Sequence, residues 1–194
     1  MIESLCVYCG SSRGTNPELE MQAAAFGKLL AEKQIRMIYG GGNVGLMGAV
    51  ANGALEEGGE VIGIITEQLN EMEVGHLDLA QLEVVKTMHD RKKRMASLAD
   101  GFVALPGGIG TLEEIFEVLT WTQLGIHPKP CSLYNISGFY DPLLDFIDHL
   151  VATGFVKQAH ADKLIVESDS KCLITRLQNY RHQTISKLTG AVIE

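Results

Sequence analysis

A short basic run and a downstream carboxylate are the side chains of this sequence best suited to chemistry on a phosphorylated compound. The run Arg91-Lys92-Lys93-Arg94 falls in the first turns of a predicted helix, where cations oppose the helix dipole. Residues that oppose the helix dipole, with no evident gain in stability, are often kept for function. In a chain of net charge −8, the run places positive charge where a phosphate can arrive. We therefore assign Arg91 and Lys92 to a site, and Lys93 and Arg94 to a solvated face.

The downstream carboxylate, Glu114, has two interpretations. The spacing from Thr111 to Glu114 is that of a capping box, in which Glu114 reaches back to the backbone of Thr111. Alternatively, its carboxylate lies at a glycine-rich rim and faces the sugar of a bound nucleotide. The sequence leaves both interpretations open. Glu113 is turned away by one helical step and is the natural control.

Three loops of small residues supply the second chemical signal, at residues 9–14, 40–45 and 106–111. Each follows a predicted strand and precedes a predicted helix, so in a parallel sheet all three lie at its carboxyl edge. Glycine there lets backbone N–H groups approach an anion, and the helix N-terminus behind the loop adds partial positive charge. Three such loops at one edge favour a nucleotide-like ligand over ordinary tight turns.

Two named phosphate motifs can be tested against these loops. A Walker A motif needs Ser or Thr after Gly-Lys, and here the Gly-Lys at residues 27–28 is followed by Leu29, which excludes a P-loop kinase or ATPase. The loop at residues 40–45 satisfies the dinucleotide pattern G-x-G-x-x-G, with Glu67 where an acid for a ribose could sit. A glycine run meets that pattern easily, so a nicotinamide enzyme is a minor alternative.

The elements that must position these residues follow from the hydrophobic pattern. Short apolar runs alternate with helix-length amphipathic segments, the pattern of βαβ units and a parallel sheet. We predict a Rossmann-like three-layer α/β/α sandwich with a mostly parallel sheet, whose ligand crevice lies beyond the carboxyl ends of the strands. Segment 66–81 is expected to be a long, functional loop. The predicted strands are 5–8, 36–39, 61–65, 82–86, 101–105 and 131–134, and the predicted helices are 17–33, 45–57, 89–99, 111–124, 141–153 and 171–187.

Composition limits the remaining choices. A length of 194 residues predicts one domain over the whole chain, and 46% hydrophobic with 21% charged residues excludes disorder, collagen and a coiled coil. The net charge of −8 argues against nucleic acid and anionic membranes as partners. No apolar run approaches the roughly 20 residues of a membrane span and no leader pattern is visible, so we expect a cytoplasmic protein. The C-x-x-C of Cys6 and Cys9 is interpreted as packed thiols, and the six scattered His residues predict no metal site.

These motifs resemble those of one known family. Residues 88–92 (MHDRK), 105–114 (LPGGIGTLEE, a PGGxGTxxE motif) and 119–125 (LTWTQLG), with the CGSS loop and GGGxxGLMG at 40–48, are similar to the LOG ("lonely guy") family of cytokinin riboside 5′-monophosphate phosphoribohydrolases. The resemblance covers roughly residues 2 to 150. It implies a homodimer that hydrolyses the N-glycosidic bond of an N6-substituted AMP to free base and ribose 5-phosphate.

Matched position by position, the resemblance makes Arg91 and Glu114 the catalytic pair. Glu73 corresponds to a substrate-contacting acid near the dimer interface. No cofactor and no metal is expected. The remaining positions that the resemblance places in the substrate site are Ser11, Gly42, Lys92, Gly107, Gly108, Ile109, Gly110, Thr111, Leu112, Glu113 and Thr120.

Two alternatives to this function remain. One is a broader nucleotide N-glycosidase that acts on plain AMP or other nucleoside monophosphates. The other is a non-catalytic carrier of a nucleotide-like cofactor, since relatives with the same fold and loops bind such cofactors. A carrier that only binds its cofactor would not require the carboxyl of Glu114. The presence of both Arg91 and Glu114 therefore favours the enzyme. Members of the family have also been labelled lysine decarboxylases, but no motif here identifies the Schiff-base lysine that this chemistry needs.

Overall fold

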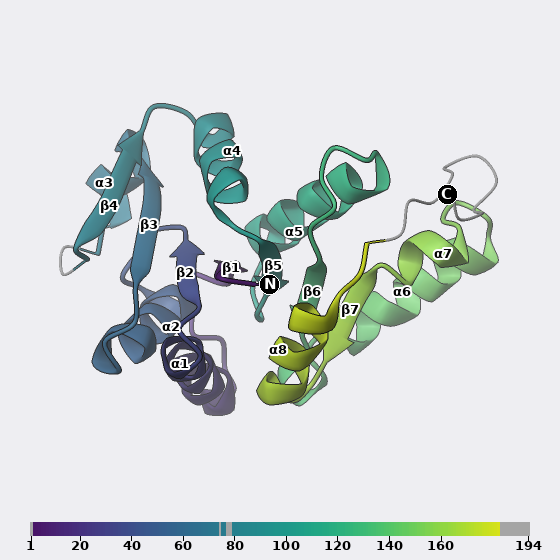
Figure 1. The fold of residues 1–194 in the computed structure, drawn as a ribbon, viewed down its shortest axis with the longest axis horizontal. Helices are drawn as coiled ribbons and strands as arrows, with labels where there is room; N and C mark the ends of the chain where they lie inside the picture. The colour runs from purple at the N-terminus through teal and green to yellow at the C-terminus, as the bar shows by residue number, and fades with distance from the viewer. Residues whose placement is uncertain (1, 74, 77–78, 183–194) are drawn as a thin grey trace.

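Seven parallel strands form the single sheet of the computed structural model, with helices on both faces (Figure 1). The structure describes residues 2–73, 75–76 and 79–182. The strands are β1 (Ser4–Tyr8), β2 (Arg36–Tyr39), β3 (Val61–Thr66), β4 (Gln81–Val85), β5 (Gly101–Ala104), β6 (Cys131–Tyr134) and β7 (Leu164–Glu167). The helices are α1 (Pro17–Glu32), α2 (Gly45–Glu56), α3 (Glu67–Glu73), α4 (Met88–Leu98), α5 (Ile109–Gln123), the short 3-10 turn η1 (Ile136–Gly138), α6 (Asp141–Ala152), α7 (Gln158–Ala161) and α8 (Ser170–Asn179).

The strand order β4-β3-β2-β1-β5-β6-β7 creates a switch point between β1 and β5. From β1 the chain builds one half of the sheet outward through β2 and β3 to β4, then returns to place β5 on the other side of β1. Tyr8 pairs with Ala104 in this central parallel ladder. In open α/β sheets, the loops diverge at such a point and leave a crevice beyond the carboxyl ends of the strands. The predicted fold class is confirmed.

Alternating strand residues face two separate layers of helices. Leu5 and Val7 of β1 join a buried cluster with residues of α1, α2 and α8. Cys6 and Tyr8 face the opposite way and join a second cluster with residues of α4 and α5. Because side chains alternate along a strand, this register points Tyr8 toward the same layer as the basic run and Glu114.

Three regions of the chain differ from the sequence prediction. The segment predicted as a long loop at 66–81 contains α3, which is too short to give a helical periodicity. Strand β7 and α7 lie where only a helical tail was expected; the apolar run of β7 becomes a strand because it pairs with β6. Helix α8 ends at Asn179, whereas a helix was predicted over 171–187, of which residues 183–187 lie outside the described part. Pro17 begins α1, and Gly125 follows α5 at a φ of 73°, as the sequence predicted.

Candidate active site

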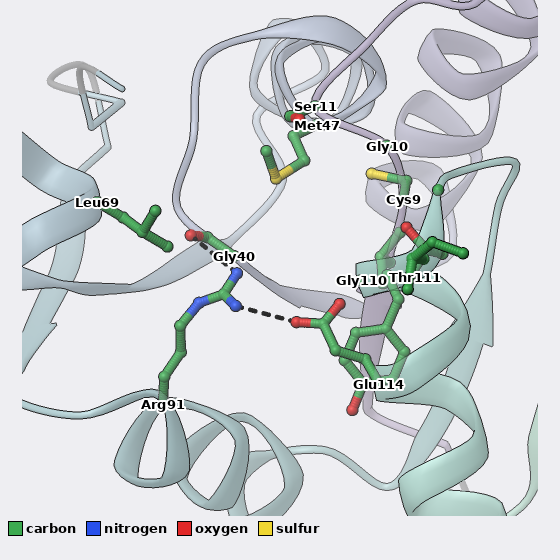
Figure 2. A pocket seen from close by; sticks show the side chains of 14 residues that line it. Cys9, Gly10, Ser11, Gly40, Met47, Leu69, Arg91, Gly110, Thr111 and Glu114 are labelled. Atoms are coloured by element: carbon green, nitrogen blue, oxygen red, sulfur yellow. Dashed lines mark hydrogen bonds and ion pairs between the residues drawn. The ribbon is translucent and has the colours of Figure 1, made fainter. Parts of the chain in front are cut away.

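A pocket of about 380 Å³ opens at the carboxyl ends of β1, β2 and β5, at the switch point of the sheet (Figure 2). Its position is that of the crevice predicted from the sequence. Both polar and apolar side chains reach it from several elements. The lining residues are Val7, Tyr8, Cys9, Gly10, Ser11, Gly40, Met47, Leu69, Arg91, Gly108, Ile109, Gly110, Thr111 and Glu114.

Arg91 enters the pocket from the first turn of α4 and is held by three other elements. Its side chain is only 9% exposed. Nε donates to the backbone oxygen of Ile64 at 2.9 Å, and Nη2 donates to that of Gly40 at 3.4 Å. Nη1 donates to Oε1 of Glu114 at 3.0 Å. Because a guanidinium is planar and its donors are fixed relative to one another, these contacts hold it in one orientation.

Glu114 projects from α5 toward Arg91, and its side chain is 13% exposed (Figure 2). Burial raises the pKa of its carboxyl above the usual range, although the neighbouring Arg91 acts in the opposite direction. The capping-box interpretation is wrong, because α5 begins at Ile109 with Gly108 as its N-cap and no side-chain cap. Thr111 therefore lies inside the helix, and the carboxylate of Glu114 binds the guanidinium instead.

The helices behind the three glycine loops differ in how their N-terminal N–H groups are used. At α2, the N–H groups of Leu46 and Met47 donate to the carbonyl of Gly10 at 3.0 and 3.3 Å. At α1, the side chain of Asn16 accepts the N–H of Glu18. At α5, in the part of the chain that the structure describes, the amides of residues 109–111 donate to no acceptor. The start of α5 is therefore the helix terminus best suited to bind an anion.

Several loop glycines are required for packing between loops. Gly45 has a φ of 58°, and a Cβ there would lie 2.3 Å from the backbone carbon of Ser11. The carbonyl of Gly41 accepts the N–H of His76, and Gly42 forms an isolated bridge with Gly75. Backbone groups of the loop at residues 40–45 are thus bonded to neighbouring segments of the chain. This weakens the alternative in which the loop binds a dinucleotide.

Seven of the predicted site residues line the pocket together: Ser11, Arg91, Gly108, Ile109, Gly110, Thr111 and Glu114. Of the other predicted positions whose side chains the structure describes, none lines this pocket. Gly107 lines an adjoining cavity of about 270 Å³, and Leu112 packs against the hydrophobic cluster under α5. Thr120 lines a separate cavity of about 200 Å³ between α5, α6 and α7. Glu73 ends α3, and its side chain lies outside the described structure.

The rest of the basic run faces away from the pocket. Nζ of Lys92 contacts the carboxylates of Glu113 and Glu117, the latter at 3.0 Å, so Lys92 joins α4 to the outer side of α5. Lys93 is exposed, and Arg94 forms a surface ion pair with Glu83 at 2.7 Å, as expected for a solvated face. Glu113 is more than half exposed and is turned away from the pocket, the position expected of a control residue.

Sequence reasoning missed several pocket residues. Tyr8 ends β1, and its place at the carboxyl end of a central strand was the signal that could have identified it. Gly40 directly follows β2, but from the sequence it was considered only as part of a phosphate motif. Met47 and Leu69 supply apolar lining from α2 and α3. No spacing pattern in the sequence indicates that these two side chains share a pocket.

The two thiols of the C-x-x-C sequence are packed in the interior, as the sequence predicted. Cys6 and Cys9 are free and buried, and burial raises the pKa of both thiols far above the usual range. Within the described ranges, no group of three or more His, Cys, Asp or Glu residues is arranged to hold a metal ion. Over the same residues, no helix has the length and apolar character needed to cross a membrane.

Comparison with solved structures supports the fold. A molybdenum cofactor carrier protein from Chlamydomonas reinhardtii superposes with a TM-score of 0.70 at 21% identity, covering 93% of this chain and 100% of that one. A molybdenum cofactor binding protein from Rippkaea orientalis gives 0.69 at 21% identity, covering 92% and 97%. At this identity the likeness concerns the fold alone. Fold and pocket together define a Rossmann-like α/β protein with a pocket at the switch point of its sheet.

Comparison of sequences identifies the family. A family described as "Possible lysine decarboxylase" matches residues 47–177. The cytokinin riboside 5′-monophosphate phosphoribohydrolase LOG of Oryza sativa subsp. japonica is 45% identical over 176 residues, which are 91% of this chain and 73% of the relative. The cytokinin riboside 5′-monophosphate phosphoribohydrolase of Rhodococcoides fascians is 44% identical over 178 residues, 91% of this chain and 90% of the relative. The chain therefore belongs to the LOG family of phosphoribohydrolases, as its motifs indicated.

Proposed function

We propose that this protein hydrolyses the N-glycosidic bond of cytokinin riboside 5′-monophosphates, which are N6-substituted AMP compounds, and releases free base and ribose 5-phosphate. One observation carries the proposal. The pocket holds a buried carboxylate, Glu114, fixed at 3.0 Å from a buried guanidinium, one turn beyond an uncapped helix start. This arrangement supplies a negative charge for a sugar and an anion site for a phosphate within a single pocket.

Glu114 is the group proposed to act on the ribose. Glycosyl hydrolysis passes through an oxocarbenium-like transition state, which a nearby carboxylate stabilises. The oxygen of water bonds to C1′ and gives up one proton, while the bond from C1′ to the base breaks. The electron pair of the broken bond leaves with the base, which takes up one proton, so the products are ribose 5-phosphate and the neutral base. Because burial raises the pKa of Glu114, its ionised form is also a stronger base toward the attacking water. The planar guanidinium of Arg91 has only hydrogen-bond donors, so its role is to position Glu114 and to bind anionic groups.

The 5′-phosphate is proposed to bind at the start of α5. The free amides of residues 109–111 and the positive end of the helix dipole both favour an anion there. Thr111, at the start of α5, and Ser11 also line the pocket. Met47, Leu69 and Ile109 add apolar surface, which supports a substrate with an apolar substituent on the base.

The competing functions are less well supported. A carrier would have no need of a buried carboxylate whose pKa is raised. A pyridoxal phosphate decarboxylase needs a lysine at its site, and among the described residues that line the pocket there is none. A plain AMP nucleosidase shares the proposed chemistry and differs only in its preference for the base.

Base release by the wild-type protein tests the function. We expect chromatography to show free base from both isopentenyladenosine 5′-monophosphate and AMP, with the former cleaved about tenfold faster or more, because an apolar group in an apolar site contributes on that scale. Equal rates would favour the broader nucleosidase. Binding of both nucleotides by calorimetry without any release of base would contradict hydrolysis and favour the carrier.

We also propose that the enzyme is a cytoplasmic homodimer. In the part of the chain that the structure describes, the cysteines are free thiols, which suits a reducing compartment. Helix α6 buries none of its residues, and Phe146 on it is 54% exposed. The apolar cavity that contains Thr120 lies beside this helix, between α5, α6 and α7. A second copy seated on this face would cover apolar surface that is costly to leave in water.

Replacing Phe146 by Glu is expected to convert the dimer to a monomer, because it places a charge in the proposed apolar interface. Sedimentation equilibrium measures the change in mass. The matched control is Met21→Glu, which puts the same charge at an exposed apolar position on α1 and should leave the dimer intact. A wild-type monomer at micromolar concentration, or a Phe146→Glu dimer, would contradict the proposed interface.

A further inference from the structure

Gly40 is the pocket residue whose role the proposed chemistry does not yet explain. It directly follows β2, so its backbone lies at the carboxyl edge of the sheet next to the switch point. Its carbonyl accepts Nη2 of Arg91 at 3.4 Å, while the carbonyl of Ile64 in β3 accepts Nε at 2.9 Å. The carbonyls of Gly40, just after β2, and of Ile64 in β3 thus bond one edge of the guanidinium, while Nη1 donates to Glu114 and to Sδ of Met88. Figure 2 shows the bonds of Arg91 to Gly40 and to Glu114.

The missing side chain of Gly40 matters as much as its carbonyl. A Cβ at this position would lie 2.1 Å from Nη2 and 3.3 Å from Cζ of Arg91, inside the space that the guanidinium occupies. Gly40 does not have a positive φ, so its backbone conformation does not itself require glycine. The steric reason for glycine here is therefore the close approach of Arg91.

We propose that Gly40 is a positioning residue: its carbonyl and its lack of a Cβ seat the guanidinium of Arg91 in the orientation that places Nη1 on Glu114. The inference rests on the proposed hydrolysis, because it assigns Gly40 a part in that reaction. It differs from a phosphate-binding role, since Gly40 acts on the substrate only through Arg91 and Glu114.

Displacement of the guanidinium would change the charge environment of Glu114. The groups that interact electrostatically with this carboxyl are Arg91 and Lys92 from α4, Glu113 on its own helix, and the buried Tyr8, Cys6 and Cys9 of β1 and the loop that follows. Among these groups, Arg91 has the largest lowering effect on the pKa of Glu114. If Arg91 moves away, burial acts with less opposition and the pKa of Glu114 rises further.

Gly40→Ala is the decisive variant. We expect kcat/KM for base release to fall about tenfold, because small displacements of catalytic groups have effects of this order or larger. We also expect the acidic limb of the pH profile to move to higher pH, which a purely structural defect would not cause. Gly101→Ala is the matched control: it adds a methyl at the start of β5, 3.1 Å or more from side-chain atoms of Pro130, Ile2 and Leu5 and away from the pocket, and should retain activity. Circular dichroism and thermal unfolding establish that both variants fold.

A double-mutant cycle separates this role from other uses of Gly40. In an Arg91→Ala background the added methyl has no guanidinium to displace. Adding Gly40→Ala to that variant should therefore lower kcat/KM by less than about twofold further. A cost equal to that in the wild-type background, or an unshifted pH limb in the single variant, would overturn the proposal. A ¹³C-carboxyl NMR titration of Glu114, assigned with Glu114→Gln, reports the pKa shift without substrate. It therefore tests the seating of Arg91 even if the wild-type protein releases no base.

Discussion

Glu114→Gln is expected to lower kcat for base release by about 100- to 1000-fold, the cost of removing one preorganised charge from a transition state. The amide is isosteric and can still accept the hydrogen bond from Nη1 of Arg91, so the pocket keeps its shape. What it loses is the negative charge that would stabilise the oxocarbenium-like sugar. Chromatographic assay of the released base at saturating nucleotide measures the loss.

The control for this substitution lies one residue earlier. Glu113→Gln changes the same chemical group on the same helix turn, but its carboxylate is exposed and contacts Lys92 outside the pocket. We expect it to keep nearly full activity. Equal losses in the two variants, or full activity in Glu114→Gln, would contradict the role assigned to Glu114.

The raised pKa of Glu114 also predicts how activity and stability depend on pH. If the ionised carboxylate is required, the rate falls as pH drops through this raised pKa, earlier than an ordinary glutamate would cause. The folded-state pKa exceeds the unfolded one, so the stabilisation linked to Glu114 is complete below the unfolded pKa and is lost as pH rises through the folded pKa. Thermal unfolding should therefore show Glu114→Gln gaining stability relative to wild type as pH rises, whereas a constant difference would argue against a raised pKa.

Arg91→Ala is expected to lower kcat/KM by about 100-fold or more, because Glu114 loses the contact that holds it in place. It also leaves a buried carboxylate without its partner, which costs about 3 kcal/mol of stability at neutral pH. That cost should shrink as pH falls, since Glu114 then binds a proton in the variant. Enzyme assays and chemical denaturation at several pH values measure both effects.

Two further variants sharpen this second prediction. Arg91→Lys keeps the positive charge but cannot bond Ile64, Gly40 and Glu114 together, so it should restore stability more than activity. Lys93→Ala removes an exposed cation from the same helix and should change neither. If Lys93→Ala lowered activity and stability as much as Arg91→Ala, the overall positive charge of the basic run would account for both effects. The geometry of the Arg91 guanidinium would then not be the cause.

The sequence predicted the fold and the location of the site well, for local reasons. Alternating apolar runs define strands whatever lies around them, and a loop that follows a parallel strand must lie at the carboxyl edge. The elements it missed are short. Helix α3 has too few turns for a periodic signal, and β7 becomes a strand only through its pairing with β6.

The sequence by itself determined that Arg91, Glu114 and the glycine loops lie at one edge of a parallel sheet, because their order relative to the strands settles it. Only the tertiary structure decided how they are used. It showed that Glu114 binds Arg91 instead of capping its own helix, that Gly10 occupies the N–H groups at the start of α2, and that the amides at the start of α5 stay free. These choices depend on contacts between segments distant in sequence, and no spacing along the chain encodes which donor meets which acceptor.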